Sequence, residues 1–321
     1  MILTMQYASQ TVIGIDFGGT KIEAALARVD GTLLERERLD THAERGPRQA
    51  LERAAQAVCR LQARACEEYG ATVAGYAAVA PGIVQRERIL LTPNLPGWED
   101  VALGRALQDV LGLEHQPAVG NDVRAGAMAE LRFGALRGAD PGLYISLGTG
   151  ISSAVTVGGR VLAGANQAAG EIAYVDPDGG ARRAPGSAPL EEIVGGRSIG
   201  ERASDLLGEQ LTAAEVFARA ATDEAAHTIV RETLDVLARS IANICALIDP
   251  ELVVLGGGMM ASADVILPAL SAHLTSALPF PPRVAAAHFT RDASLHGAVA
   301  LALFEISQPE ESQLTTVGSC V

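Results

Sequence analysis

Three glycine-rich turns, each at the end of a short apolar run, constrain this chain more than any other feature. The turns occupy residues 16–21, 147–150 and 255–258, and the runs before them, residues 11–15, 143–146 and 252–254, are typical of buried strands. A strand that ends in glycines brings backbone N–H groups close to a ligand beyond the sheet. Phosphate is the usual occupant, because only glycine permits that approach. Three such turns predict a nucleotide held between two halves of the chain.

Composition narrows the class of protein and of partner. A length of 321 residues indicates about two domains. The formal net charge of −13 argues against nucleic acid as the main partner and against an anionic membrane surface, since both require clustered Lys and Arg. No apolar run approaches the ~20 residues that span a bilayer, and the first ten residues lack the segments of a secretory signal.

Cysteine and histidine usage adds two further expectations. The four cysteines form no Cys-x-x-Cys pair, so we expect a reducing, cytoplasmic location. The six histidines share no His-x-x-x-His spacing and none lies near a cysteine pair, so we expect no protein-bound zinc.

The chain divides into two α/β halves that open with the same order of elements. In the first half the patterns predict strands at 12–16, 21–29 and from 32, a helix at 47–69 and a strand at 73–79. In the second they predict strands at 143–147, 152–157, 160–162 and 252–255, and helices at about 225–248 and 263–276. Strand, turn, strand opens both halves, which indicates an internal duplication of the fold.

The expected boundaries follow from this organisation. We predict an N-terminal α/β lobe over residues 1–137 and a C-terminal α/β lobe over 138–294, divided at a loop rich in glycine and proline. A helix at about 295–306 could pack on the N-terminal lobe, and the polar tail 307–321 is expected to fray and to carry no chemistry.

Asn121 and Asp122 follow a short apolar strand and precede a helical pattern. A carboxylate there could accept the proton of an attacking hydroxyl, as in many phosphoryl transfers. The alternative is a helix N-cap, for which Asn and Asp are both common. The local sequence favours the cap, and the glycine turns shift the balance towards catalysis.

Three other segments carry polar residues suited to a sugar. Asn94 lies in a proline-rich loop with Trp98, the only tryptophan; this pair suits a sugar, but a proline turn with a core-anchoring tryptophan is an equal alternative. Glu171 and Glu191 could accept hydrogen bonds from hydroxyls, although the local sequence favours ordinary surface carboxylates.

Together these segments resemble the ROK family of repressors, open reading frames and sugar kinases. The resemblance is carried by motifs in family order from residue 12 to about 300: residues 16–21, 93–98, 121–122, 147–151, 169–172 and 248–258. It implies an α/β, two-lobed actin-like or hexokinase-like ATPase fold, that is, a duplicated ribonuclease-H-like fold.

The resemblance also implies roles for individual residues. Asp122 would be the catalytic base for the 6-hydroxyl of a sugar, Asp16 would support Mg²⁺, and no structural zinc is implied because the family's zinc ligands are absent. Residues implied in sugar binding are Asn94, Asn121, Asp122, Glu171, Tyr174 and Glu191. Residues implied in nucleotide binding are Asp16, Gly18, Gly19, Thr20 and Lys21 in the first turn, Gly148, Thr149 and Gly150 in the second, and Gly256, Gly257 and Gly258 in the third.

The chain departs from the family pattern at two places. Tyr174 stands where the family has a zinc-binding histidine, and the family's zinc cysteines align with Arg182, Ala184 and Pro189. Residues 152–153 are both serine where the family often has a glycine.

The resulting hypothesis is an ATP-dependent kinase that phosphorylates the primary 6-hydroxyl of a glucose-like hexose, with Mg²⁺ arriving on the nucleotide and two lobes closing around the sugar. The first alternative is a kinase for an amino sugar or cyclitol of secondary metabolism, suggested by Tyr174 and the missing zinc loop. The second is a sugar-responsive regulator without its own DNA-binding domain. The resemblance implies a homo-oligomer, either dimer or tetramer, and the phosphoryl donor stays open between ATP and polyphosphate.

Overall fold

The computed structural model describes residues 10–92, 94–177, 179 and 186–308. The chain divides into two compact units: unit 1 comprises Met1–Ala129 and Asp292–Val321, and unit 2 comprises Glu130–Arg291. The sequence placed these divisions after residues 137 and 294, whereas the units divide after 129 and 291. The first division falls inside helix α4 (Asp122–Phe133) rather than in the loop that follows it.

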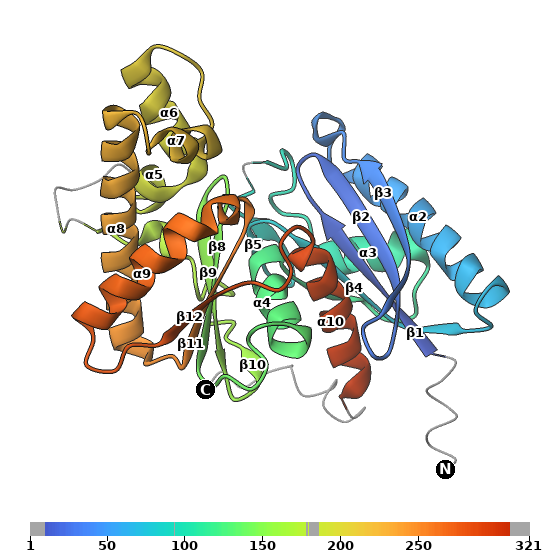
Figure 1. Cartoon of the computed structure of the whole chain (residues 1–321). Helices are drawn as coiled ribbons and strands as arrows, with labels where there is room; N and C mark the ends of the chain where they lie inside the picture. Colours follow the sequence, from blue (N-terminus) through green and yellow to red (C-terminus); the bar gives the residue numbers. More distant parts are fainter. Residues whose placement is uncertain (1–9, 93, 178, 180–185, 309–321) are drawn as a thin grey trace. The chain divides into compact units, whose positions relative to one another are not determined.

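Unit 1 is built on a five-stranded sheet with the order β3-β2-β1-β4-β7 (Figure 1). Strand β2 is antiparallel to both β1 and β3, while β1 and β4 are parallel, as are β4 and β7. A short pair, β5 with β6, forms a separate sheet. The strands are β1 (Gln10–Phe17), β2 (Lys21–Arg28), β3 (Leu33–Asp40), β4 (Thr72–Ala80), β5 (Ile83–Val84), β6 (Ile89–Leu90) and β7 (Ala118–Asn121).

Helices cover both faces of this sheet. The unit contains η1 (Ala43–Arg45), α2 (Pro47–Glu67), α3 (Leu103–Leu111), the first part of α4 and α10 (Ala293–Ser307). Alternate residues of β1 point to opposite faces: Ile13, Ile15 and Phe17 belong to the core that α2 completes. Gly14 faces α10, where an added Cβ would lie 2.6 Å from the backbone nitrogen of Val299. Only glycine therefore lets α10 approach the central strand this closely.

Unit 2 repeats the same sheet, with the order β10-β9-β8-β11-β12. Strand β9 is antiparallel to both β8 and β10, while β8 and β11 are parallel, as are β11 and β12. Unit 1 has the same arrangement. The strands are β8 (Gly142–Leu147), β9 (Ile151–Val157), β10 (Arg160–Val161), β11 (Leu252–Gly256) and β12 (Arg283–Ala286). The shared order confirms the predicted duplication and the predicted α/β fold class.

The helices of unit 2 enclose one large apolar core with β8, β9 and β11. They are η2 (Ile172–Tyr174), α5 (Glu191–Val194), α6 (Gly196–Leu207), α7 (Ala213–Arg219), α8 (Glu224–Ile248), η3 (Gly258–Ser262) and α9 (Ala263–Ala277). The sequence predicted α8 and α9 but not α6, α7 or the edge strand β12. In unit 1 it did not predict α3, and it placed the polar tail from 307, although Ser307 is the last residue of α10; residues 309–321 lie outside the described part.

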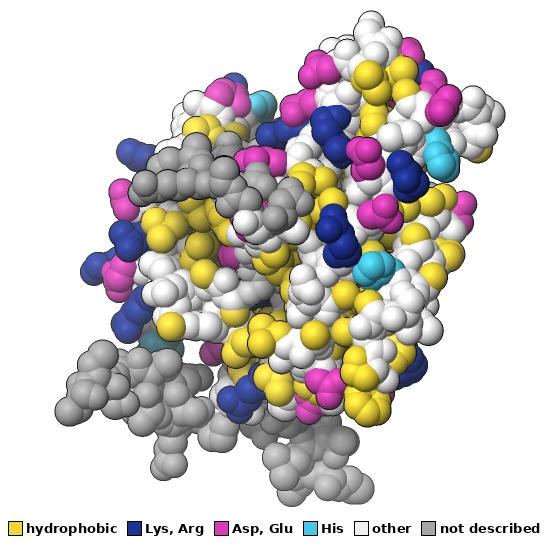
Figure 2. All heavy atoms as spheres, turned by 90° about the vertical axis from the view of Figure 1, so that its left-hand side faces the viewer, with side chains coloured by type: hydrophobic (Ala, Val, Ile, Leu, Met, Phe, Trp, Pro, Cys, Tyr) yellow, Lys and Arg dark blue, Asp and Glu magenta, His cyan; other side chains and the backbone are white. Residues whose placement is uncertain are grey.

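The surface and the helices bear on two of the expectations about partners. On the face that Figure 2 presents, Lys and Arg side chains are interspersed with Asp and Glu rather than gathered in one patch. No helix in the described part of the chain is long and apolar enough to cross a membrane.

Candidate active site

The first glycine turn joins β1 to β2 and is held by backbone bonds in unit 1. The N–H of Gly18 donates to the carbonyl of Lys21 at 2.9 Å, and the hydroxyl of Thr41 donates to the carbonyl of Gly18 at 2.6 Å. A Cβ on Gly19 would lie 2.8 Å from the carbonyl oxygen of Asn94. The structure thus brings the exposed Asn94 against the first turn, and glycine at 19 is required for that approach.

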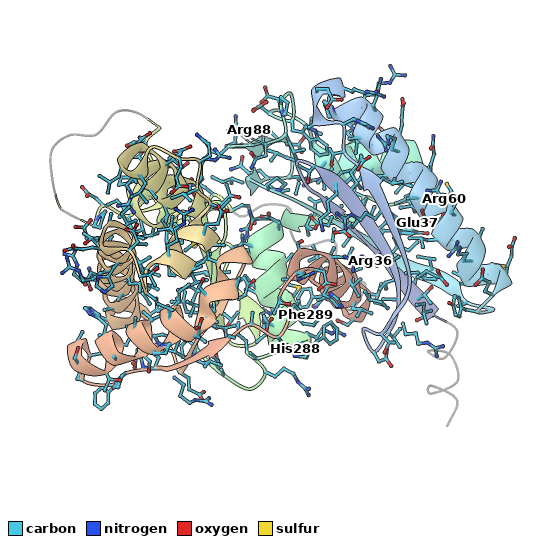
Figure 3. The ribbon with its side chains drawn as sticks, turned by 45° about the horizontal axis from the view of Figure 1, so that its top comes forward. Arg36, Glu37, Arg60, Arg88, His288 and Phe289 are labelled. Carbon is cyan, nitrogen blue, oxygen red and sulfur yellow. The ribbon has the colours of Figure 1, made fainter. Side chains whose placement is uncertain are left out.

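Lys21 belongs to a chain of charges rather than standing alone. Its ammonium pairs with the buried carboxylate of Glu23, which also accepts two bonds from the guanidinium of Arg36, at 2.7 and 3.2 Å. Arg36, labelled on β3 in Figure 3, bonds in turn to Asp292 at 3.0 Å. Burial opposes ionisation of Glu23, but the bonds from Lys21 and Arg36 hold its pKa below the usual value. This series of ion pairs links the first turn to the residue before α10.

Asp16, one residue before the end of β1, carries a buried carboxyl group whose pKa is raised. Burial raises its pKa to about 7; the charges of Asp122 and Glu23 act in the same direction, and a hydrogen bond from Ser294 opposes them. The Ser294 hydroxyl donates to Oδ2 of Asp16 at 2.5 Å. Asp16 and Asp122 are therefore close enough for their charges to interact, so the structure brings these two predicted residues together.

The structure divides the roles of Asn121 and Asp122. Asn121 is the N-cap of α4: its Oδ1 accepts the N–H of Arg124 at 2.9 Å, and its side-chain amide donates to the carbonyl of Gly82 at 2.8 Å. Asp122 opens the helix, and its Oδ1 accepts the N–H of Val123 at 2.9 Å. Burial raises the pKa of Asp122 above its usual value. The capping alternative therefore applies to Asn121, and the carboxylate of Asp122 keeps acceptor capacity for other chemistry.

Trp98 resolves the alternative left open for the loop at 92–98. Its ring is fully buried and packs against Phe17, with ring centroids 5.1 Å apart. Trp98 is therefore a core anchor, and no part of its ring is available to a sugar. Pro93 lies outside the described residues, while Asn94 is exposed beside it.

The second glycine turn joins β8 to β9 in unit 2. The N–H of Gly148 donates to the carbonyl of Gly150 at 2.9 Å. The carbonyls of Gly148 and Thr149 accept the N–H groups of Gly196 and Arg197, at 2.9 and 3.1 Å. These bonds attach the second turn to the start of α6.

The third turn lies directly beside the second. Gly257 has a φ of +90°, and a Cβ there would lie 2.2 Å from the carbonyl oxygen of Leu147. A Cβ on Gly148 would lie 3.9 Å from the nitrogen of Gly258, so the two turns face each other. The structure thus brings together two glycine turns that are about a hundred residues apart in the chain.

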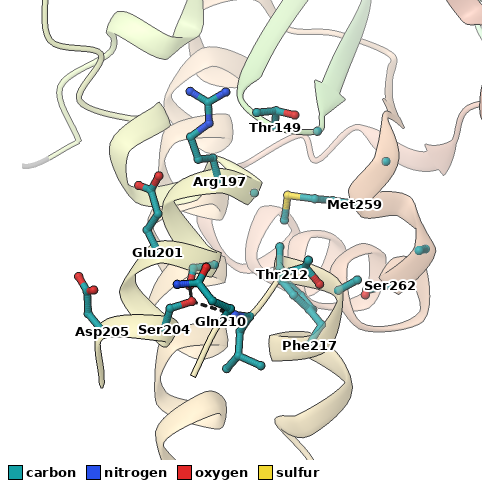
Figure 4. Close-up of a pocket in the computed structure, with 18 residues that line it drawn as sticks. Thr149, Arg197, Glu201, Ser204, Asp205, Gln210, Thr212, Phe217, Met259 and Ser262 are labelled. Atoms are coloured by element: carbon teal, nitrogen blue, oxygen red, sulfur yellow. Dashed lines mark hydrogen bonds between the residues drawn. The ribbon is translucent and has the colours of Figure 1, made fainter. Parts of the chain in front are cut away.

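A cavity of about 650 Å³ opens where these two turns meet α6 and α7 (Figure 4). Of the predicted nucleotide residues in unit 2, Gly148, Thr149 and Gly258 line it, whereas Gly150, Gly256 and Gly257 shape the turns without lining it. The other lining residues, which the sequence did not predict, are Gly196, Arg197, Gly200, Glu201, Ser204, Asp205, residues 210–214, Phe217, Met259, Ala261 and Ser262.

The lining combines an apolar part with polar groups near the turns. Leu211, Phe217 and Met259 are buried apolar side chains. Arg197 lies close to Thr149 in Figure 4 and supplies a positive charge at the turn end. A cavity of this size, with apolar walls and a few polar groups, fits a nucleotide.

The sequence carried one signal from which helix α7 could have been predicted: Thr212 and Glu215 form a capping box at its start.

Tyr174, Glu171 and Glu191 form a cluster in unit 2. Burial raises the pKa of the Tyr174 phenol, and the charges of Glu171 and Glu191 raise it further. The Tyr174 side chain is 44% exposed and therefore accessible to a ligand. Ser153, one of the two departures at 152–153, donates from its hydroxyl to the carbonyl of Gly170 at 3.0 Å, so it fixes the segment that leads into Glu171.

The segment that replaces the family's zinc loop is held by backbone and apolar contacts where it is described. The N–H of Leu190 donates to the carbonyl of Ala173 at 3.1 Å, and Leu190 is fully buried. Arg182 and Ala184 lie outside the described residues, and Pro189 is buried. Among the residues that the structure describes, no group of three or more His, Cys, Asp or Glu side chains is placed to hold a metal ion.

Comparisons with known proteins agree with this geometry. The ROK family model matches residues 12–305. An N-acetylmannosamine kinase of Shigella boydii is 34% identical over 91% of this chain and 98% of its own length. The structure of a ROK hexokinase from Thermus thermophilus superposes with a TM-score of 0.77 at 30% identity, covering 92% of this chain and 99% of that one. A ROK glucokinase from Streptomyces griseus, solved with glucose and AMPPNP, gives 0.70 at 26% identity over 91% and 99%. The chain therefore belongs to the ROK family, as one of its ATP-dependent sugar kinases.

Proposed function

We propose that this enzyme transfers the γ-phosphoryl group of ATP to the primary 6-hydroxyl of an amino sugar, with N-acetylmannosamine as the acceptor that best fits. The observation that carries the proposal is the 34% identity, over nearly both full lengths, to an enzyme named N-acetylmannosamine kinase, against 26% to the Streptomyces glucokinase. The sequence had put a glucose-like hexose first and an amino sugar second. The comparisons support the reverse order.

The cluster around Tyr174 supports an acceptor that differs from glucose. A phenol hydroxyl donates one hydrogen bond and accepts others, and its ring carries it farther from the backbone than an imidazole. The Tyr174 hydroxyl would donate to the acetyl oxygen of a 2-acetamido group. Glu171 beside it would accept a bond from a ring hydroxyl or from the amide N–H.

Asp122 is the proposed catalytic base. It would accept the proton of the 6-hydroxyl while the hydroxyl oxygen bonds to the γ-phosphorus and the bond to the bridging oxygen of ADP breaks. The products are the sugar 6-phosphate and ADP. Because burial raises its pKa, Asp122 is a stronger base than an exposed carboxylate. Asn121 supports this role by capping α4 itself.

The nucleotide would occupy the cavity of unit 2, with its phosphates at the second and third turns. Mg²⁺ fits the residues present, because Asp16 and Asp122 are two carboxylates of unit 1 that lie close enough for their charges to interact. Asp16 would hold the ion, since Mg²⁺ in nucleotide sites needs only one or two carboxylates besides phosphates and water. When bound, the ion supplies charge neutralisation at the phosphates.

A coupled assay of ADP release tests the acceptor. The panel is N-acetylmannosamine, N-acetylglucosamine, glucose, mannose and a cyclitol, each with ATP as donor. With polyphosphate as donor no ADP is released, so the sugar phosphate formed is measured instead. We expect kcat/KM for N-acetylmannosamine to exceed that for glucose by about tenfold or more. Glucose turned over as well or better would overturn the amino sugar assignment, and sugar binding without turnover would indicate the regulator instead.

A matched variant ties the result to the site. Y174F removes one hydroxyl and keeps the ring, so it should lower kcat/KM for N-acetylmannosamine by about tenfold, the cost of one hydrogen bond. Activity on glucose should change much less, because glucose has no acetamido group for the phenol to bind.

A further inference from the structure

Glu191 lies between two parts of unit 2 that have different tasks. Its Oε2 accepts the N–H of Ile151, the residue directly after the second glycine turn, at 3.0 Å. A Cβ on Gly150 would lie 1.9 Å from Oε2 and 2.6 Å from Cδ of Glu191. The carboxylate therefore occupies the space that a side chain at 150 would take, and it fixes the end of the turn.

The charge of the same carboxylate also reaches Tyr174, in the cluster proposed for the acceptor. The charges of Glu171 and Glu191 both raise the pKa of the Tyr174 phenol, which places each of the two carboxylates within electrostatic reach of Tyr174. Glu191 thus contacts the phosphate side of the unit with one oxygen while its charge acts on the acceptor side.

The backbone around Glu191 leaves little freedom for it to move independently. Leu190, before it, donates to the carbonyl of Ala173, and Gly195, after it, donates to the carbonyl of Glu191 at 2.8 Å. A Cβ on Gly195 would lie 2.7 Å from the carbonyl oxygen of Glu191 and 3.1 Å from that of Thr149. Helix α5 is therefore packed between the segment 171–174 and the turn 148–150.

We propose that Glu191 is a positioning residue that couples the acceptor site to the phosphate turn. An acceptor hydroxyl that bonds to the carboxylate fixes its orientation, and Oε2 then holds Ile151 and Gly150 in the arrangement that binds phosphate. Acceptor and nucleotide consequently strengthen each other's binding, and the coupling is the same in both directions. The coupling rests on the proposed function, because it takes Tyr174, Glu171 and Glu191 as acceptor contacts.

A double-mutant cycle tests the contact with the turn, without any sugar. Gly150 does not have a positive φ, so alanine fits the backbone there, and the three atoms nearest to its Cβ all belong to Glu191. G150A should therefore weaken binding of MgADP, measured by calorimetry, by about tenfold in the native enzyme. It should weaken binding less than twofold in E191A, where the obstructing carboxylate is gone.

The second measurement compares MgADP affinity with and without saturating N-acetylmannosamine. We expect the sugar to tighten ADP binding by about fivefold or more in the native enzyme, in the range of typical allosteric coupling, and to have no effect in E191A. E191Q keeps an acceptor oxygen for the Ile151 N–H, so its ADP affinity without sugar should stay within about twofold of native. E192Q is the matched control on the same helix and should keep both native values.

The outcomes separate this inference from the proposed function. The inference is wrong if G150A weakens MgADP binding by the same factor in the native enzyme and in E191A. It is also wrong if the sugar tightens MgADP binding in E191A as much as in the native enzyme. If the native enzyme binds no N-acetylmannosamine, the acceptor assignment is wrong. The cycle with MgADP alone then still decides the turn contact, and the coupling is measured with the panel sugar that turns over.

Discussion

The proton affinity of Asp16 predicts a pH-dependent cost to the stability of unit 1. Asp16 is only 9% exposed, and burial raises its pKa from the ordinary value of 3.8 to about 7. A carboxyl with a raised pKa binds its proton more tightly in the folded protein than in the unfolded chain. The free energy of unfolding therefore falls as the pH rises from about 4 to about 7, and the loss is complete above that range.

The size of the effect follows from the two pKa values. Each tenfold difference in proton affinity is worth about 1.36 kcal/mol, so the shift from 3.8 to about 7 corresponds to about 4 kcal/mol. About 1.7 kcal/mol of this is already lost at pH 5, which leaves roughly 2.5 kcal/mol to be lost between pH 5 and 8. D16N removes the titration and keeps an oxygen that accepts the Ser294 hydroxyl. The free energy of unfolding of D16N relative to native should therefore rise by roughly 2.5 kcal/mol over that interval.

The chain offers a local probe for this measurement. Trp98 is the only tryptophan and lies buried against Phe17 in unit 1, so its fluorescence during urea unfolding reports on the unit that contains Asp16. The assay is a series of urea titrations of the ligand-free enzyme from pH 5 to 8. D40N, at the exposed end of β3, is the control and should follow the native pH profile. A difference between D16N and native that stays constant within about 0.5 kcal/mol from pH 5 to 8 would refute the reasoning.

Two further predictions concern the base and the packing of α10. D122N keeps an acceptor for the Val123 N–H but loses the base, so kcat in the ADP-release assay should fall by about a thousandfold while the acceptor Kd changes little; near-native kcat would remove Asp122 from the mechanism. G297A would place a Cβ 2.1 Å from the carbonyl oxygen of Ala125 and should cost about 3 kcal/mol in urea unfolding. In the control G104A, the one tight neighbour of the Cβ is the flexible end of Gln116, at 3.2 Å, and the other contacts are ordinary, so this substitution should be neutral or stabilising. Equal effects of the two substitutions would show that α10 does not depend on that close approach.

The fold was largely predictable because its strands and long helices leave periodic patterns. The runs ending at Asp16, Leu147 and Leu255 were correctly predicted as strands. The long helices α2, α8 and α10 were correctly predicted as helices. The failures have a common cause: α3, α6 and α7 are only 7 to 12 residues long and start beside glycines or small residues, so their periodicity is brief. The edge strand β12 has four residues after two prolines and shows no alternation of burial.

Single side chains were harder to assign than elements, because a side chain's role depends on which hydrogen bonds its neighbours have already taken. Asn121 and Asp122 are both good capping residues, and no local rule decides between them. In the structure Asn121 takes the cap and the bond to Gly82, so the neighbouring carboxylate is left for chemistry. Trp98 illustrates the same limit, since its use as a core anchor depends on Phe17, which is distant in sequence.

The cavity in unit 2 shows which parts of a site a sequence can reveal. The glycines at 148, 257 and 258 are readable as turn motifs, and at Gly257 the backbone excludes any other residue, because its φ is +90° and a Cβ there would lie 2.2 Å from the carbonyl oxygen of Leu147. The walls contributed by α6 and α7 use side chains such as Leu211 and Phe217, which are equally suited to an ordinary core. Glu191 lies between these cases. Its conflict with a side chain at 150 exists only in three dimensions, and it makes the identity of a turn residue depend on a carboxylate 41 positions later. Substitutions at Gly150 and Glu191 should therefore be interpreted as a pair, because the cost of either depends on which residue occupies the other position.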